Sequence, residues 1–396
     1  MRRRMVAVLV AVAIGGAALP DAGAAQAVTV QANAAHTGNA AGAGLRPPLR
    51  RAWSRGLPGR VSYPVVAGGR VFVVRSRPEQ GGSDVVALSV DSGRVLWRRD
   101  LGKEAEAGAV AVGGGRLVVT RESYFDEGDP SGVLALAPED GRVLWEQGTG
   151  LFGQPPVVDG GTVYVNGLNQ VGVTALSLAD GSILWRAGTE SGNLGAPAVG
   201  SGGVFAAMSS CPDVYRFARG DGAPVWHPDN DCHGGGGSIP VLYRGRLYVV
   251  TESDRWPPGD TYDAASGAIV APLRADLTPV FSGRIGVFPD ARRPLENAAA
   301  YGSVLVARDV VTGRRRWSFR GDGYLDSAPL IAGGRLYVGS GSGRVFGVDL
   351  RSGRRVWRTP PGPPIPFPTN TLTTSGLAAA EHTLFVPALG RLTAYR

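Results

Sequence analysis

The sequence predicts an all-β fold, an eight-bladed β-propeller, on three observations. A repeat recurs about every 40 to 48 residues, short apolar segments alternate with glycine-containing turns, and most repeats carry a tryptophan at one fixed place. A period of this length with about four short strands per unit is typical of a propeller, in which each unit forms one blade. No long segment shows the apolar periodicity of a helix.

The first recurring element has the spacing Ala-x5-Gly-x3-Trp. It is complete in four repeats, at residues 87–97, 135–145, 175–185 and 307–317. Segments 216–226 and 347–357 keep the glycine and the tryptophan, whereas in 261–271 Ala271 replaces the tryptophan. A large flat side chain at a fixed place is expected to wedge between neighbouring blades, with its N–H bonded to backbone. The predicted blade-docking residues are Trp53, Trp97, Trp145, Trp185, Trp226, Trp317 and Trp357.

The second recurring element, first seen as "PVVAGGRVFV" from Pro64, occurs in eight variants between the copies of the first. Its Gly-Gly dipeptide, and the Asp-Gly or Ser-Gly of the first element, supply the positive φ angles of tight hairpin turns. Proline at the start of a strand removes no ladder hydrogen bond. Each repeat therefore predicts antiparallel strands, and eight repeats predict eight blades.

The two ends of the chain complement each other. Residues 390–396 begin a repeat that stops, and Trp53 ends a repeat that has no beginning. Joined, they complete one blade, with the N-terminal segment as its outer strand, and the ring then has no open sheet edge. We assign residues 45–396 to a single propeller domain and residues 28–44 to an N-terminal extension.

Residues 1–27 have the pattern of a secretory signal peptide. Three arginines precede an apolar run from Met5 to about Leu19, and small-x-small sites follow at 22–24 and 25–27. The apolar run is short for a membrane anchor, although an uncleaved anchor is the alternative. We expect a secreted, extracellular monomer with no membrane span after cleavage.

The two cysteines, Cys211 and Cys232, predict one disulfide, because an exported protein with a small even number of cysteines usually pairs them. Cys232 belongs to "DCHGGGGS", which also suggests a metal ligand or a phosphate-binding loop. A disulfide removes the thiolate, the glycines lead into a strand and not a helix, and the four histidines lack zinc spacing. We interpret the stretch as a structural junction at a blade, held by the disulfide, and predict no metal site.

The chain carries a formal net charge of +8, and Lys103 is its only lysine. A basic surface can attract nucleic acid or an anionic envelope. The arginines occur mostly singly at equivalent turn positions, which indicates a compositional bias spread over the turns. We therefore expect no nucleic-acid partner.

These repeats resemble the PQQ-repeat β-propellers (PQQ is pyrroloquinoline quinone), a quinoprotein-like and BamB-like family with secreted bacterial members. The resemblance covers nearly all of the chain after the signal and rests on the in-phase copies of Ala-x5-Gly-x3-Trp. It implies either of two functions. One branch contains PQQ-dependent alcohol and sugar dehydrogenases, and the other contains binding propellers such as BamB of the β-barrel assembly machinery. The fold alone does not choose between them.

The dehydrogenase branch requires a quinone in the central channel, a divalent metal with oxygen ligands, and a carboxylate near the substrate hydroxyl. Many of its members also have two adjacent cysteines, whereas the two cysteines here are 21 positions apart. No converging set of Glu, Asn and Asp is evident. We therefore expect a non-catalytic binding or scaffold propeller with no catalytic residue and no cofactor. A dehydrogenase with PQQ and Ca²⁺ is the alternative, and a carbohydrate- or cell-wall-binding propeller is the second.

The candidate ligand contacts are polar or aromatic residues just before each inner strand, which in phase would form a ring around one mouth of the channel. Alternatively, each of them satisfies backbone groups between blades. The expected ligand is a protein or a cell-envelope component. The candidates are Tyr63, Gln154, Asn193, His233, Ser238, Thr278, Asp326, Ser327 and Ser375.

Overall fold

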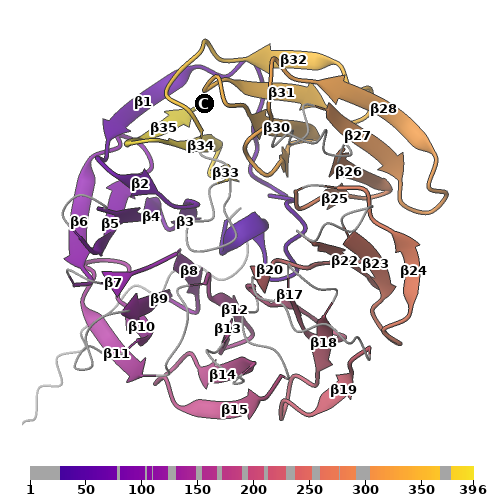
Figure 1. Cartoon of the computed structure of the whole chain (residues 1–396). Coiled ribbons are helices and arrows are strands. Elements are labelled where there is room, and N and C mark those ends of the chain that lie inside the picture. The colour runs from indigo at the N-terminus through magenta and orange to yellow at the C-terminus, as the bar shows by residue number, and fades with distance from the viewer. Residues whose placement is uncertain are drawn as a thin grey trace, which may run out of the picture.

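Eight antiparallel sheets stand around a central axis in a ring (Figure 1). The computed structural model describes residues 27–77, 81–102, 105–108, 110–123, 131–148, 154–166, 172–189, 195–208, 213–228, 237–251, 259–275, 277–290, 304–365 and 376–396. In this part of the chain the one helical element is the short 3-10 helix η1 (Val30–Ala32), and no helix is long and apolar enough to cross a bilayer. The prediction of an all-β, eight-bladed propeller is confirmed.

Blades 1 to 7 each use four consecutive main strands, ordered from the channel outwards. Blades 1 to 3 contain β3 (Val65–Ala67), β4 (Arg70–Ser76), β5 (Ser83–Ser89) and β6 (Val95–Asp100); β8 (Val110–Gly113), β9 (Arg116–Ser123), β10 (Gly132–Leu136) and β11 (Val143–Gly148); and β12 (Val157–Asp159), β13 (Thr162–Asn166), β14 (Val173–Ser177) and β15 (Ile183–Ala187). Three additional two-residue strands pair with second strands of blades 1, 2 and 4: β2 (Arg60–Val61), β7 (Ala105–Glu106) and β20 (Gly237–Ser238).

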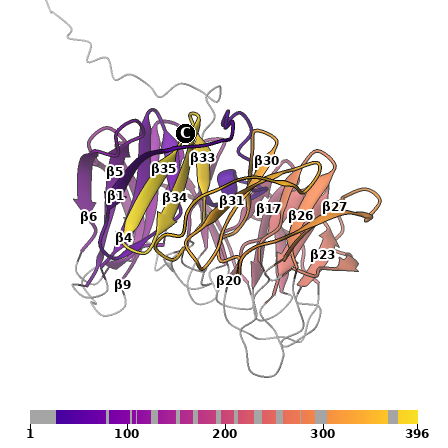
Figure 2. The same cartoon turned by 90° about the horizontal axis from the view of Figure 1, so that it is seen from above.

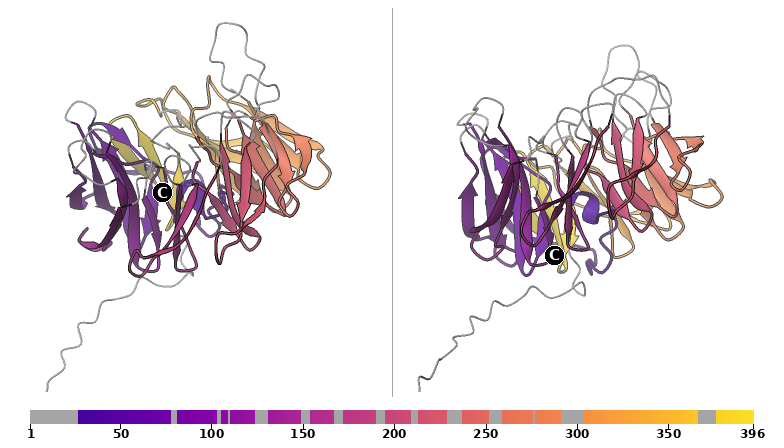
Figure 3. Two further views of the ribbon diagram at one scale, coloured as in Figure 1. Left: turned by 60° about the horizontal axis from the view of Figure 1, so that its bottom comes forward. Right: turned by 90° about the horizontal axis from the view of Figure 1, so that it is seen from below.

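Blades 4 to 7 repeat the same order. They contain β16 (Ala198–Gly200), β17 (Gly203–Met208), β18 (Val214–Phe217) and β19 (Pro224–Trp226); β21 (Val241–Tyr243), β22 (Arg246–Val250), β23 (Gly259–Asp263) and β24 (Ile269–Pro272); β25 (Val280–Ser282), β26 (Ile285–Pro289), β27 (Val304–Asp309) and β28 (Arg315–Arg320); and β29 (Leu330–Ala332), β30 (Arg335–Gly339), β31 (Val345–Asp349) and β32 (Arg355–Arg358). Seen on edge, the strands run along the axis of the ring (Figures 2 and 3).

Blade 8 is built from both ends of the chain. Its inner three strands are β33 (Ala378–Ala380), β34 (Thr383–Ala388) and β35 (Arg391–Tyr395), and its outer strand is β1 (Arg51–Gly56). β1 pairs with β35 in antiparallel register, with Trp53 opposite Ala394. The predicted closure of the ring by N- and C-terminal strands in one blade is confirmed.

Seven tryptophans join neighbouring blades. Each indole N–H donates to a backbone carbonyl of the next blade at 2.8 to 3.2 Å: Trp53 to Val90, Trp97 to Pro138, Trp145 to Leu178, Trp185 to Arg219, Trp226 to Ala264, Trp317 to Leu350 and Trp357 to Leu49. In six of these junctions the ring covers the glycine of the next repeat. A Cβ on Gly353, for example, would lie 2.7 Å from Trp317. The repeated glycine and tryptophan are therefore the two halves of one inter-blade contact.

The junction between blades 5 and 6 lacks this contact. Ala271 stands where the tryptophan would be, and an added Cβ on Gly313 of blade 6 would meet nothing within 4 Å. Ile269 and Val270 of β24 are 54% and 48% exposed, and Val311 beside Gly313 is 63% exposed. Blades 5 and 6 are consequently held together without the tryptophan contact that joins the other seven pairs of neighbouring blades.

Candidate binding site at the central channel

The N-terminal extension lies inside the ring, where η1 occupies the centre of Figure 1. Residues 27–43, here called the channel segment, pass the eight blades in order. In six blades an inner-strand amide donates to a carbonyl of the channel segment at 2.7 to 3.0 Å: Val66 to Ala27, Val112 to Val28, Val199 to Ala34, Leu242 to Ala35, Phe281 to Thr37 and Ile331 to Gly38. In blade 3 the Thr29 hydroxyl donates to the Pro156 carbonyl (2.9 Å), and in blade 8 the His382 amide donates to the Ala43 carbonyl (2.9 Å).

This arrangement satisfies the innermost edge of each sheet. The channel-facing N–H groups of an inner strand need acceptors, and here the main chain supplies them. The segment approaches closely because most of its residues are small: Ala27, Ala32 and Ala43 are at most 3% exposed. At Gly38 any side chain is excluded, since a Cβ would lie 2.1 Å from Val280 Cγ1. The channel at the level of the inner strands is therefore filled by the chain itself.

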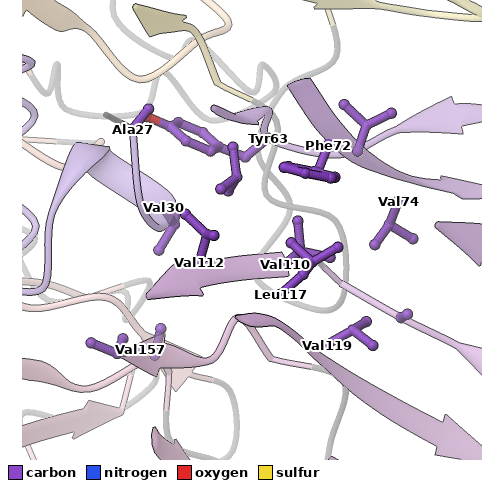
Figure 4. Packing of buried hydrophobic residues seen from close by; sticks show 14 of the residues in the cluster. Ala27, Val30, Tyr63, Phe72, Val74, Val110, Val112, Leu117, Val119 and Val157 are labelled. Atoms are coloured by element: carbon purple, nitrogen blue, oxygen red, sulfur yellow. The ribbon is translucent and has the colours of Figure 1, made fainter. Parts of the chain in front are cut away.

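Three residues of the channel segment have positive φ angles without being glycine: Gln31 (56°), Ala32 (73°) and His36 (57°). Such conformations persist only where the surroundings fix them. Ala32 is held by the hydroxyl of Tyr63, which accepts its amide N–H at 3.2 Å. Figure 4 shows Tyr63 beside Ala27 and Val30, at the side chains of the first blades. The channel segment is thus an integral part of the folded domain.

His36 is completely buried in the channel segment. Its Nδ1 lies 3.1 Å from the Pro240 carbonyl, and Nε2 has no hydrogen-bond partner among the described residues. Burial lowers the pKa of His36 from 6.5 to about 4, although the bond to Pro240 opposes this shift. The imidazole is therefore neutral at pH 7, and its Nδ1–H donates to Pro240.

A pH dependence of stability follows. Because the pKa of His36 is lower in the folded than in the unfolded chain, its contribution to stability is complete above pH 6.5 and is lost as the pH falls towards 4. The loss amounts to about 3 kcal/mol in the free energy of unfolding. Denaturant unfolding of wild type and His36→Asn at pH 7.5, 6 and 4.5 tests this, with a steeper decline expected for wild type. Parallel declines would contradict the assignment.

The described candidates before the inner strands do not share one repeat position. Tyr63 and Thr278 directly precede their prolines, whereas Ser238 and Ser327 stand two residues before theirs. Neighbouring residues of an extended chain point to opposite sides. The Ser238 hydroxyl donates to the Val250 carbonyl at 2.8 Å, and the Ser327 hydroxyl accepts the Gly339 amide at 2.7 Å. Both serines thus tie the start of a blade to its second strand.

The remaining candidates have different surroundings. Gln154 is half-buried, and its carbonyl accepts the Thr120 hydroxyl at 2.6 Å. Thr278 is half-buried at the start of blade 6. Five residues lie outside the described part of the chain, so the predicted disulfide and ligand contacts there stay predictions: Asn193, Cys211, Cys232, His233 and Ser375.

Among the described candidates, Asp326 is the one with an ionisable side chain that has no partner in the described part of the chain. It is half-buried before β29, no described residue donates a hydrogen bond to its carboxylate, and burial raises its pKa. Its neighbour Asp322 accepts from Arg344 at 2.7 Å and from Ser342 at 2.9 Å, so that carboxylate is neutralised. Tyr324 between them is 49% exposed. Asp326 and Tyr324 together offer an acceptor and an aromatic face at the start of blade 7.

Sequence reasoning missed a second polar cluster, in blade 4. The rings of Tyr215 and His227 stack with centroids 4.1 Å apart, and His227 Nε2 lies 3.3 Å from Asp213 Oδ1. Asp213 is only 3% exposed. The one sequence signal was a histidine directly after the docking Trp226, which the repeat pattern does not require.

The described residues do not fit a quinone with a divalent metal. No group of three His, Cys, Asp or Glu side chains gathers anywhere in this part of the chain. Of the two carboxylates near β29, that of Asp322 already forms an ion pair with Arg344. The channel at the inner strands is occupied by residues 27–43.

Eight four-stranded blades tied by tryptophan-on-glycine contacts define the class of PQQ-repeat β-propellers. The family model for outer membrane protein assembly factor BamB matches residues 81–210, 212–364 and 260–396, and the chain belongs to this family of PQQ-repeat propellers. No curated protein sequence matches the chain.

Solved structures share the fold at low sequence identity. BamB from Moraxella catarrhalis is 17% identical, with a TM-score of 0.60 over 88% of this chain and 97% of that one. A quinohemoprotein alcohol dehydrogenase from Pseudomonas putida HK5 is 13% identical, with a TM-score of 0.65 over 94% of this chain and 80% of that one. The computationally designed Ika8 protein is 11% identical, with a TM-score of 0.63 over 86% of this chain and 97% of that one. These likenesses establish the fold only.

Proposed function

We propose that this protein is a secreted, non-catalytic binding propeller that holds a protein or cell-envelope ligand at the end of the ring where the inner strands begin. The observation that carries the proposal is the channel segment, which bonds to all eight blades in the central channel, where the resemblance to the dehydrogenase branch implies a quinone. Membership of the BamB family supports a binding role. The signal-like N-terminus supports export, and its first small-x-small site at 22–24 lies before the channel segment.

The proposed contact surface contains Tyr324 and Asp326, with Thr278 of the neighbouring blade. An exposed aromatic ring supplies contact area, and a carboxylate without an internal partner prefers a cationic or hydrogen-bond-donating group on the ligand. A carbohydrate ligand is the weaker candidate, because the seven docking tryptophans are engaged between blades and cannot stack on sugars.

The proposal is tested first against the dehydrogenase alternative. Purified protein is titrated with PQQ and Ca²⁺ by calorimetry, and dye reduction is assayed with alcohols and sugars. We expect no saturable uptake of the quinone and no turnover. Saturable binding accompanied by dye reduction would overturn the proposed function.

Ligand capture then tests the surface. Immobilised protein is exposed to envelope and culture-fluid fractions, and wild type is compared with Tyr324→Ala/Asp326→Asn. We expect the double variant to capture about tenfold less ligand than wild type, as is usual when two hot-spot residues of an interface are removed. The matched control, Val311→Ala/Asp91→Asn, changes exposed residues of hairpins that follow the third strands and should bind like wild type. Equal capture by all three proteins would contradict this location.

A further inference from the structure

The ring gathers arginines on one part of its outer wall. β28, β32 and β1 follow one another along the outer edge (Figure 1). These strands of blades 6, 7 and 8, together with the turns before them, form what we call the basic wall. In the equivalent segments 308–320, 348–360 and 44–56 there are only two acidic residues, Asp309 and Asp349. The thirteen arginines there are Arg46, Arg50, Arg51, Arg55, Arg308, Arg314, Arg315, Arg316, Arg320, Arg351, Arg354, Arg355 and Arg358.

The guanidinium groups of the basic wall are exposed and mostly unpaired. All thirteen arginines fall in the exposed class. Within the described residues only Arg316 forms an ion pair, at 2.5 Å from Asp309. Both aspartates also pair with arginines at the start of second strands: Asp309 pairs with Arg284, directly before β26, and Asp349 pairs with Arg335 of β30. Among the described residues, most of the positive charge of the wall is therefore not neutralised.

The other five blades differ. Their equivalent segments contain seven arginines and nine acidic residues. At the position just before the docking residue, blade 6 has Arg316, whereas the other blades have apolar residues there, including the exposed Val356 (43%) in blade 7 of the wall. The expected arginine bias in the turns is therefore concentrated in three repeats, which the fold places side by side.

We infer that the basic wall is a docking surface for a linear phosphodiester polymer of the cell envelope. The guanidinium of arginine is always charged, and its planar fork matches the oxygens of a phosphate. A cluster of such groups binds a polyanion through released counterions, without reading its sequence. The inference goes beyond the proposed function, since the wall lies on outer strands and not on Tyr324 and Asp326, but it rests on the proposed export.

The shape and composition of the wall favour a flexible chain over two other phosphate-bearing partners. The outer strands of three successive blades form a convex surface, which a linear polymer can follow and a flat bilayer meets only in part (Figure 1). The three outer strands of the wall have no fully exposed Trp or Phe: Trp317 and Phe319 of β28 are each 8% exposed, and Trp53 of β1 and Trp357 of β32 are half-buried. Bilayer anchoring and stacking of nucleic-acid bases both use such exposed rings.

The test uses one arginine from each blade of the wall at the same position of the repeat. Labelled poly(glycerol phosphate) is titrated by fluorescence anisotropy with wild type, with Arg50→Gln/Arg314→Gln/Arg354→Gln, and with a control triple variant. We expect saturable binding that weakens with salt, and a loss of about tenfold or more in the wall variant at low salt. The slope of log K against log salt should fall by about 2, because each lost phosphate contact contributes roughly 0.7 to 0.9.

The control removes the same charge elsewhere: Arg94→Gln/Arg142→Gln/Arg186→Gln, in blades 1 to 3. All three arginines are exposed, and Arg94 and Arg142 occupy the repeat position of Arg314. Near-wild-type binding of the control supports the wall. Equal loss in both variants would mean that net charge alone attracts the polymer, and would overturn the inference.

Stronger binding to phosphatidylglycerol vesicles or to double-stranded DNA, at equal phosphate concentration, would also overturn the inference. Tyr324→Ala/Asp326→Asn should still bind the polymer, so that failure of this inference and failure of the proposed function are distinguishable.

Discussion

A chain that lacks residues 27–43 is expected to lose much of its stability, with a free energy of unfolding lower by roughly 5 kcal/mol or more. Six inner-strand amides would lose their acceptors, each worth about 0.5 to 1.5 kcal/mol net. The buried side chains of the channel segment, among them Val30 (4% exposed), would leave an open channel. Denaturant unfolding followed by circular dichroism measures the difference.

A point variant keeps this prediction testable if the truncated chain does not fold. Gly38→Val places a Cβ 2.1 Å from Val280 Cγ1 and forces a β-branched residue into a φ of +63°. It should therefore destabilise by several kcal/mol. Ala41→Val is the matched control, because Ala41 is exposed and should tolerate the change. Unfolding midpoints that agree for Gly38→Val, Ala41→Val and wild type would show that the segment is not held in the channel.

Trp317→Ala is expected to destabilise the propeller by about 3 to 5 kcal/mol, the usual cost of removing a buried tryptophan. The indole is 8% exposed, covers Gly353 of blade 7 and donates to the Leu350 carbonyl at 2.9 Å. Its loss leaves a gap between two blades and an acceptor without its donor. Urea unfolding of Trp317→Ala measures the total loss. Trp317→Phe keeps an aromatic ring but lacks the N–H, so its unfolding separates the contribution of the hydrogen bond from that of ring burial.

The junction between blades 5 and 6 provides the reverse experiment. Ala271→Trp restores a ring over Gly313, where there is open space, and places an N–H near Val310, the counterpart of Leu350. We expect a gain of roughly 1 to 2 kcal/mol in the free energy of unfolding. Loss of stability on Ala271→Trp, or no loss on Trp317→Ala, would contradict the tryptophan-on-glycine account of how the blades are joined.

The fold could be predicted because its determinants recur in the sequence. The spacing of Ala87, Gly93 and Trp97 is repeated in phase, and the structure uses it at each tryptophan junction as one contact between two blades. The role of residues 27–43 could not be predicted in this way. Their bonds to the blades are made almost entirely by main-chain carbonyls, which leave no side-chain pattern; the small residues and Gly38 were the only trace.

The candidate site was predicted less completely than the fold. The candidates were chosen as residues just before each inner strand. They stand at different distances from the following proline, however, and a shift of one position reverses the direction of a side chain, as between Thr278 and Ser327. The basic wall was missed for a different reason. Its arginines stand about a repeat apart in the sequence, and Arg50 comes beside blade 7 only because β1 closes the ring.

The central claim is that the chain's own N-terminal segment fills the channel at the level of the inner strands. Hydrogen exchange of the inner-strand amides tests it most directly. The amides of Val66, Val112, Val199, Leu242, Phe281 and Ile331 face the channel segment. The account predicts that they exchange as slowly as amides of the central strands, such as that of Val73. Exchange as fast as that of an exposed hairpin amide would show an open, solvent-filled channel and contradict the account.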